Sequence, residues 1–524
     1  MRSILLTLPL VGLLAAAAAA AETAGKDTRL VQAVKAGNTA EAVALLGKKV
    51  DVNAGEADGT TPLHWAVRND DAALVDRLIR AGADVKAANR YGVTAIVLAC
   101  QNGSAAVVER LLKAGVSANA TQPLGETALH TCARTGKPAA ARVLIAHGAS
   151  VDPGESWRGQ TPLMWAAAEG HADMVRLLVE AGADANARST VVTWERQRTE
   201  EPRDKWLPPG GLTPLLYAAR DGRLEAARAL ADAGADINVV DPDRHTALIL
   251  ALINGHFDVA GLLIDKGIDV NMEDKVGRTA LMAAVDAHTV PSSNRPAPRE
   301  TDDALTSFEV IGKLLDEGAR VDAPLRAQIP YRTKLDRGGD GVLGAGTTPL
   351  IRAAKAADVP VLTLLLSKGA NPKAATRNGV TPIMIAANVA AREEDMTGRN
   401  KTEAEIIASI RLLREAGGDL NGADTQGRTA LHGAALWGLT DVVKFLHESG
   451  ADLNVADKRG FTPLDTALGL AGGFGFDGRS AVVQEATAKA IRELGGSSGT
   501  PVAGAPTGRQ GGGAAREADP QDAN

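Results

Sequence analysis

Hydrophobic and polar positions along this chain follow a pattern that returns about every 33 residues. The stretch 159–186, GQTPLMWAAAEGHADMVRLLVEAGADAN, shows the pattern most clearly. Thr161 has the features of a helix N-cap, and Pro162 follows at the first helical position, where a missing N–H costs nothing and the fixed φ is already helical. The small apolar residues after them predict one short helix.

A second helix is predicted in the same stretch. Met174, Leu177 and Leu178 recur at i, i+3 and i+4, which places them on one apolar stripe. Gly182 ends this helix, because glycine enters the left-handed region without a Cβ penalty. Each copy of the pattern is therefore a pair of short helices that must stack on its neighbours to bury its apolar faces.

Alignment on the N-cap threonine gives eleven copies, at Thr61, Thr94, Thr127, Thr161, Thr213, Thr246, Thr279, Thr348, Thr381, Thr429 and Thr462. Most steps are 33 residues, and three are longer, at 52, 69 and 48 residues. The excess is inserted loop. Insertions 189–210 and 325–346 fall between repeats, whereas 288–304 and 391–402 separate the two helices of one repeat.

The repeat opening reads TPLH at 61–64 and TALH at 127–130 and 429–432, and GAD-type strings close the second helices. A 33-residue unit of this kind resembles the ankyrin repeat. The resemblance implies an all-α solenoid of about twelve helix-turn-helix units with short β-hairpin fingers and four loop insertions. With a leading unit at 27–53 and a closing helix at 480–494, the array is expected to span 27–495.

The two ends of the chain differ from the array. Residues 1–21 have a basic Arg2, an apolar run and an alanine-rich end, which indicates a secretory signal peptide; an uncleaved membrane anchor is the alternative. Residues 22–26 form a short segment before the array, and the Gly/Ala/Pro-rich residues 496–524 are expected to be disordered. We therefore expect a bacterial, periplasmic or secreted protein without stable membrane insertion after leader cleavage.

Charge and candidate chemistry restrict the function. The net charge is -6, which does not favour nucleic acid. The two cysteines, Cys100 and Cys132, occupy positions where other repeats have alanine, so they are buried fillers or, in an oxidising compartment, a disulfide between adjacent repeats. No catalytic, metal or cofactor motif is found, and we expect no enzyme activity, cofactor or metal. The resemblance implies a structural role for His64, His130 and His432 in the repeat openings.

By resemblance, partners of such arrays contact the residue before the N-cap and the two residues that end the first helix. Candidate partner-binding residues at these positions form a moderately basic strip of Arg68, Arg134, Arg220, Asp221 and Lys355. A second candidate patch combines Leu436, Trp437 and Phe461 with the loop residues Phe474 and Phe476. These aromatic residues either bind a partner or fold back over the last repeat.

Two further groups of aromatic residues have an expected place. Trp65, Trp165 and Tyr217 lie four residues after their threonines, where the family packs an apolar side chain, and are expected in the core. Trp194 and Trp206 flank a charged stretch in the first insertion. Either they pack a binding finger against the concave face, or they pack against each other at the base of their own hairpin.

The function expected from the sequence is a non-catalytic scaffold that binds a protein in the periplasm or outside the cell. One alternative is a small-ligand binder or enzyme with a site between the inserted loops and the concave face. Another is a secreted effector that binds a host protein. Fold alone names no partner.

Overall fold

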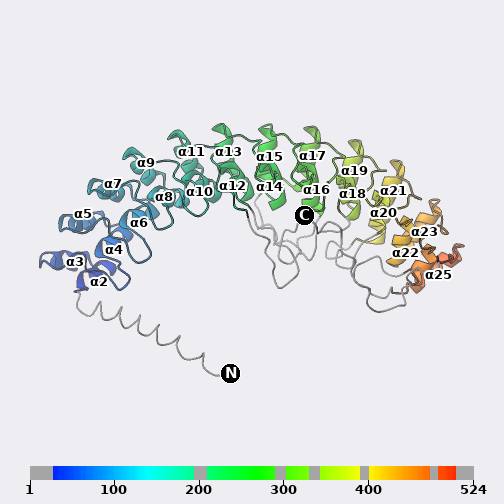
Figure 1. The fold of residues 1–524 in the computed structure, drawn as a ribbon, viewed down its shortest axis with the longest axis horizontal. Helices are drawn as coiled ribbons and strands as arrows, with labels where there is room; N and C mark the ends of the chain where they lie inside the picture. Colours follow the sequence, from blue (N-terminus) through cyan, green and yellow to red (C-terminus); the bar gives the residue numbers. More distant parts are fainter. Residues whose placement is uncertain are drawn as a thin grey trace, which may run out of the picture. The chain divides into compact units, whose positions relative to one another are not determined.

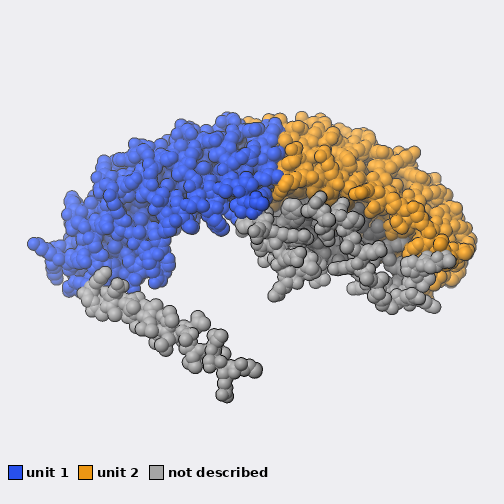
Figure 2. Space-filling view, in the orientation of Figure 1, with its two compact units in different colours: residues 1–197, 207–242 blue, residues 198–206, 243–524 orange. Residues whose placement is uncertain are grey.

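The computed structural model describes residues 27–193, 209–289, 303–329, 343–389, 401–471 and 482–502. The chain divides into two compact units (Figures 1 and 2). Unit 1 comprises Met1–Gln197 and Leu207–Pro242, and unit 2 comprises Arg198–Trp206 and Asp243–Asn524. Each unit is described by itself below.

Unit 1 holds twelve helices in its described residues. They are α2 (Arg29–Lys35), α3 (Thr39–Leu46), α4 (Pro62–Arg68), α5 (Ala72–Arg80), α6 (Ala95–Asn102), α7 (Ala105–Lys113), α8 (Ala128–Thr135), α9 (Pro138–Ala146), α10 (Pro162–Glu169), α11 (Ala172–Glu180), α12 (Pro214–Arg220) and α13 (Leu224–Asp232). The even-numbered helices are the first helices of each repeat and pack on one another in chain order, and the odd-numbered helices form a second layer.

Unit 2 continues the same plan over its described residues. Its helices are α14 (Ala247–Asn254), α15 (Phe257–Asp265), α16 (Ala280–Thr289), α17 (Ser307–Asp316), α18 (Pro349–Lys355), α19 (Val359–Ser367), α20 (Pro382–Ala386), α21 (Glu403–Glu415), α22 (Ala430–Leu436), α23 (Thr440–Glu448), α24 (Pro463–Ala467) and α25 (Glu485–Glu493). The all-α repeat fold expected from the sequence is confirmed.

Most of the repeat threonines cap the first helices as the pattern predicts, whereas Thr94 takes the N-cap position without a side-chain hydrogen bond. Thr161 has extended backbone angles, and its hydroxyl oxygen accepts a hydrogen bond from the Met164 N–H at 3.4 Å. Thr279 does the same for the Met282 N–H at 3.3 Å. Gly182, after the second helix of that repeat, has a φ of 92°, which is the left-handed conformation that ends the helix. These local signals fix the helix bounds.

The loops that join one repeat to the next, called fingers here, were expected to be short β-hairpins. Within the described residues they are tight turns that carry only isolated bridges, such as Ala88 with Thr94 and Thr121 with Thr127. Most successive fingers are linked by a backbone hydrogen bond. The Ser156 N–H donates to the Leu124 carbonyl at 2.8 Å in unit 1. The Thr425 N–H donates to the Asn378 carbonyl at 2.9 Å in unit 2.

Four insertions lie where the repeat spacing places them. Residues 189–210 and 325–346 fall between repeats, before α12 and α18, while 288–304 and 391–402 fall mainly between the two helices of a repeat. Trp194 and Trp206 lie outside the described residues, so their two expected roles stay predictions.

The C-terminal end of the array corrects two expectations. The closing helix begins at Glu485 rather than at residue 480, and Val482 before it is 71% exposed. The first residues of the expected disordered tail instead form a last finger. The Ser497 N–H donates to the Asn454 side-chain oxygen at 2.8 Å, and the Val502 N–H donates to the Arg459 carbonyl at 2.9 Å. Residues 497–502 of the expected tail therefore pack against the finger that contains Asn454 and Arg459.

The two cysteines lie on adjacent first helices, α6 and α8, and both thiols are free and fully buried. Burial, together with a hydrogen bond to Cys132, raises the pKa of the Cys100 thiol well above its usual value. The prediction that Cys100 and Cys132 are small buried residues is confirmed, and the structure holds them as free thiols.

Candidate functional site

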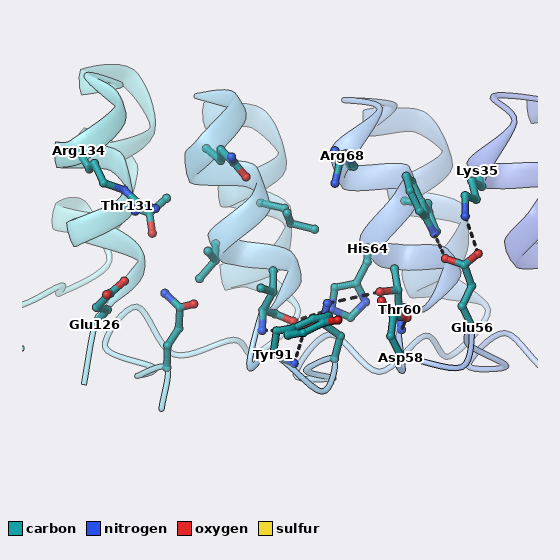
Figure 3. Close-up of a pocket in the computed structure, with 17 residues that line it drawn as sticks. Lys35, Glu56, Asp58, Thr60, His64, Arg68, Tyr91, Glu126, Thr131 and Arg134 are labelled. Atoms are coloured by element: carbon teal, nitrogen blue, oxygen red, sulfur yellow. Dashed lines mark hydrogen bonds and ion pairs between the residues drawn. The ribbon is translucent and has the colours of Figure 1, made fainter. Parts of the chain in front are cut away.

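A groove of about 490 Å³ opens in unit 1 between three consecutive fingers and the first helices α4, α6 and α8 (Figure 3). Its lining is mostly polar and carries charges of both signs. The lining residues are Lys35, Glu56, Asp58, Thr60, His64, Trp65, Arg68, Asn89, Tyr91, Val93, Val97, Leu98, Gln101, Gln122, Glu126, Thr131 and Arg134.

One end of the groove is held by Glu56 of the first finger. Its carboxylate accepts hydrogen bonds from the Lys35 ammonium at 2.7 Å and from the Trp65 indole N–H at 2.9 Å. Lys35 also lies 4.8 Å from the Trp65 ring centroid. The acid therefore neutralises the lysine and fixes the tryptophan, so this end is pre-ordered.

The histidines of the repeat openings tie each repeat to the next finger. The Thr61 N–H donates to His64 Nδ1 at 3.2 Å, so the neutral ring carries its proton on Nε2 and donates it to the Val93 carbonyl at 3.0 Å. His130 repeats these contacts with Thr127 and the Gln160 carbonyl. Burial lowers the pKa of both histidines. Their predicted structural role is confirmed by these hydrogen bonds.

Arginines stacked on aromatic rings recur along the first helices of unit 1. Arg68 lies 5.4 Å from the Trp65 ring centroid, and Arg134 lies 5.4 Å from that of Trp165 in the next repeat. Both arginines are exposed, and neither forms an ion pair with a described residue. The structure thus brings two of the predicted binding residues, Arg68 and Arg134, into the groove with free guanidinium groups.

The other predicted basic residues of the strip do not line the groove. Arg220 is half-buried, lies 4.9 Å from the Tyr217 ring centroid and donates two hydrogen bonds of 2.8 Å to Asp221. Lys355 belongs to unit 2 and is half-buried. Its carbonyl accepts a hydrogen bond of 3.0 Å from Lys401, whose pKa falls to about 7 because its ammonium is buried and lies near the Lys355 charge.

The predicted C-terminal patch is corrected at Phe461. This side chain is 1% exposed, and its carbonyl accepts a hydrogen bond from His432 Nε2 at 3.0 Å, so Phe461 belongs to the core. The segment that follows α25 packs against the same finger, because a Cβ on Gly460 would collide with the Thr500 carbonyl oxygen. That distant segment closes a surface which the local sequence leaves open.

The remaining members of the patch have a mixed outcome. Leu436 and Trp437 are half-buried, and the Trp437 indole nitrogen is buried without a hydrogen-bond partner in the described residues. Phe474 and Phe476 lie outside those residues. A binding role for these four residues stays a prediction.

The aromatic residues expected in the core are placed more finely by the structure. Tyr217 is 4% exposed, and its hydroxyl accepts a hydrogen bond from Gln160 at 2.7 Å. Trp65 and Trp165 are half-buried, with their rings under the arginines described above. These two tryptophans therefore lie partly at the surface as well as in the packing of their repeats.

Sequence reasoning missed a row of exposed apolar side chains at the fingertips of unit 1. Tyr91 is 63% exposed, Leu124 is 56% exposed and Trp157 is 70% exposed. Each lies three or four residues before a repeat threonine. The signal was available in the sequence, because the same place is polar in four of the six repeats of unit 2, at Asp243, Asn378, Gln426 and Arg459.

Comparisons with known proteins identify the family. Models described as ankyrin repeats in three copies match residues 30–122, 96–189 and 215–290, a many-copy model matches 413–467, and the single ankyrin repeat matches 345–377. These ranges together cover more than half of the chain, and the chain belongs to the ankyrin-repeat family. Such repeats are scaffolds for protein–protein interaction, and the fold is typically non-enzymatic.

Among solved structures, the crystal structure of the human ASB11 ankyrin repeat domain is similar at 25% sequence identity. The match covers 46% of this chain and 99% of that chain, with a TM-score of 0.39. No curated protein matches the chain.

Two further features of the described residues bear on the site. No group of three or more His, Cys, Asp or Glu side chains there could hold a metal ion. No helix in that part of the chain is long and apolar enough to cross a membrane.

Proposed function

We propose that this ankyrin-repeat chain is an exported scaffold whose unit 1 groove holds a segment of a protein partner. The observation that carries the proposal is the pair of free, ring-stacked guanidinium groups of Arg68 and Arg134 in a pre-ordered groove. Arginines beside aromatic rings are frequent anchors of protein interfaces. Gln101 and Gln122 line the same groove and can hydrogen-bond the backbone of an extended segment.

The spacing of the two arginines indicates the chemistry of the segment. They lie two repeats apart, and neighbouring helices pack at about 8 to 10 Å, so their separation is roughly 20 Å. An extended chain rises about 3.3 to 3.6 Å per residue, so roughly six residues span that distance. We expect a partner segment with two carboxylates about six positions apart, each paired with one guanidinium.

Crosslinking mass spectrometry on the native protein, followed by binding measurements with the protein it identifies, tests the groove. Arg68→Glu with Arg134→Glu should weaken that binding about a hundredfold, because two anchors become repulsive. The matched control is Arg77→Glu with Arg80→Glu, which reverses two exposed charges on α5 in the second-helix layer. Equal binding by both variants, or crosslinks spread over α5, α7 and α9, would contradict the proposal.

Export rests on residues 1–21, which lie outside the described residues. The basic start, apolar run and alanine-rich end of this segment support a cleaved leader. N-terminal sequencing of the protein from fractionated cells should show a mature chain that begins after residue 21, in the periplasmic or extracellular fraction. A full-length chain in the cytoplasmic fraction would refute export and leave the groove proposal in place.

A further inference from the structure

A line of exposed apolar side chains runs along the fingers of unit 1, and only its first member, Tyr91, also lines the groove. We define the fingertip row as Tyr91, Leu124, Trp157 and Val191, which are 63%, 56%, 70% and 55% exposed. They come from four consecutive fingers. Aromatic residues make up only 3% of the chain, so two that stand this far in water at neighbouring fingertips require a physical explanation.

The fingers of the row are tight turns, and two of the three steps between them carry a backbone hydrogen bond. The Ser156 N–H donates to the Leu124 carbonyl at 2.8 Å, and the Thr190 N–H donates to the Arg158 carbonyl at 2.7 Å. The fingers also touch, because a Cβ on Gly125 would lie 2.5 Å from the Ser156 hydroxyl. The exposed side chains are therefore carried on an ordered backbone, and little conformational entropy is lost when they bind.

Both aromatic tips carry an arginine. Arg90 donates a hydrogen bond of 2.7 Å to the Tyr91 hydroxyl and lies 4.9 Å from its ring centroid, while Arg158 lies 5.2 Å from the ring centroid of Trp157. Glu155, the acid nearest in sequence to the Trp157 tip, is turned inward. It is 6% exposed, and its carboxylate accepts the N–H groups of Trp157 and Arg158 at 2.6 and 2.8 Å.

The shape of the row decides between two kinds of partner. Apolar side chains on successive tips are separate projections roughly 10 Å apart, as the repeat spacing sets them. A folded protein would need a matching pocket for each projection, whereas a fluid surface accepts them at any spacing. Tyrosine and tryptophan favour the boundary between lipid and water, and a neighbouring arginine can pair with lipid phosphate.

We propose that the fingertip row docks unit 1 reversibly on a lipid surface that contains anionic phospholipids. This inference goes beyond the proposed function, because Leu124, Trp157 and Val191 do not line the groove. The whole chain has a net charge of -6, so long-range attraction does not drive the contact. Apolar insertion supplies the affinity, and Arg90 and Arg158 supply the preference for anionic headgroups.

Vesicle co-sedimentation of the mature chain tests the proposal. The probes are vesicles of phosphatidylcholine alone and of phosphatidylcholine mixed in equal parts with phosphatidylglycerol. We expect binding to the mixed vesicles and a loss of about tenfold or more in Leu124→Ser with Trp157→Ser, since two inserted side chains are removed. The matched control is Asn378→Ser with Gln426→Ser, which changes two exposed fingertips of unit 2 and should bind as the unchanged chain does.

Two further measurements make each outcome decisive. Arg158→Gln should remove most of the preference for anionic vesicles while binding through the rings persists. The difference in fluorescence between the unchanged chain and Trp157→Phe should shift to the blue on vesicle binding, because the indole leaves water. Circular dichroism should show that these surface variants are folded.

Failure to sediment with either vesicle, or equal sedimentation of the Leu124→Ser/Trp157→Ser variant, would overturn the proposal. Loss of a crosslinked protein in that variant, without vesicle binding by the unchanged chain, would identify the row as a protein contact instead. The groove variant Arg68→Glu/Arg134→Glu should still bind vesicles, so failure of the groove proposal and failure of this one are distinguishable.

Discussion

The fingers of unit 1 and of unit 2 share a backbone plan but place their arginines differently. In unit 2, Asp274 accepts the N–H groups of Val276 and Arg278, and its other oxygen accepts Arg278 Nε at 2.8 Å. Arg278 is 2% exposed. Asp424 and Arg428 repeat this arrangement. The arginine in these fingers is directed inward and neutralises a buried acid.

In unit 1 the same turn is held without a buried arginine. Asn89 accepts the N–H groups of Tyr91 and Val93, both at 3.0 Å. Val93 takes the place that Arg278 has in unit 2, and Arg90, three residues earlier, stacks on the exposed Tyr91 ring. The acceptor alone does not separate the two kinds of finger, because the buried Glu155 carboxylate accepts backbone N–H groups in the Trp157 finger and Arg158 there still stacks on an exposed ring. The comparison teaches that the residue before the repeat threonine makes the difference: Arg278 and Arg428 of unit 2 pair with the acid of their own finger, whereas Val93 and Gln160 stand at that place in unit 1.

The largest effect is expected where a buried ion pair is broken in a unit 2 finger. Asp274→Ala leaves the Arg278 charge buried without its carboxylate, which should lower the free energy of unfolding by about 3 to 5 kcal/mol. Urea unfolding measures the loss, and hydrogen exchange should place it in α14 to α17, because repeat stability is local. Asn89→Ala in unit 1 should cost much less, about 1 to 2 kcal/mol, since it removes hydrogen bonds but no charge partner.

A second variant tests whether the loss of stability in Asp274→Ala comes from the unpaired Arg278 charge, whatever the size of that loss. Asp274→Ala combined with Arg278→Met removes both charges and should recover part of the lost stability. A double variant that is less stable than Asp274→Ala alone would show that the ion pair is not what distinguishes the unit 2 finger.

A smaller contrast is expected in acid. Burial lowers the pKa of His64 and His130 in unit 1 and of His432 in unit 2. Below an unfolded pKa near 6.5 the unfolded chain binds more protons at these sites than the folded chain does. The contribution of these histidines to the free energy of unfolding is therefore intact above that unfolded pKa and is lost as the pH falls below it. With two such histidines against one, unit 1 should lose more stability than unit 2.

Hydrogen exchange at pH 7 and pH 5 checks this difference between α4 to α10 and α22 to α24. His64→Gln with His130→Gln should cost about 1 to 2 kcal/mol per site at pH 7, because capping and buried hydrogen bonds are lost. The same variant should reduce the excess acid sensitivity of unit 1. An undiminished difference would assign it to other groups.

The repeat, its N-cap threonines and its paired helices could be predicted from the sequence because their signals are local. Thr161 and Gly182 act within one or two turns of helix, so residue spacing is enough to place them. Phe461 could not be placed in this way, since its burial accompanies contacts from the segment near Thr500. The exposure of Trp157 also depends on how a finger turns, which helical periodicity does not describe. The groove likewise arises only when Lys35, Arg68 and Arg134 are brought together from different repeats.

The smallest expected effect concerns the one finger link in the row that a proline prevents. By the pattern of the other fingers, residue 123 would donate its N–H to the Tyr91 carbonyl, but Pro123 has none. Pro123→Ala restores a donor worth about 0.5 to 1.5 kcal/mol and gives up about 0.4 to 1 kcal/mol of unfolded-state restriction, so the free energy of unfolding should change by less than about 1 kcal/mol.

The amide of residue 123 in this variant is the sensitive measure, because stability barely changes. If the link forms, that amide exchanges as slowly as the Ser156 amide, which donates to the Leu124 carbonyl. Vesicle binding should then be unchanged or slightly tighter, since the Tyr91 and Leu124 tips are held together more firmly. An amide that exchanges as fast as one in open solvent would mean that the fingers are not held at this spacing, and the rigidity argued for the fingertip row would lose its support.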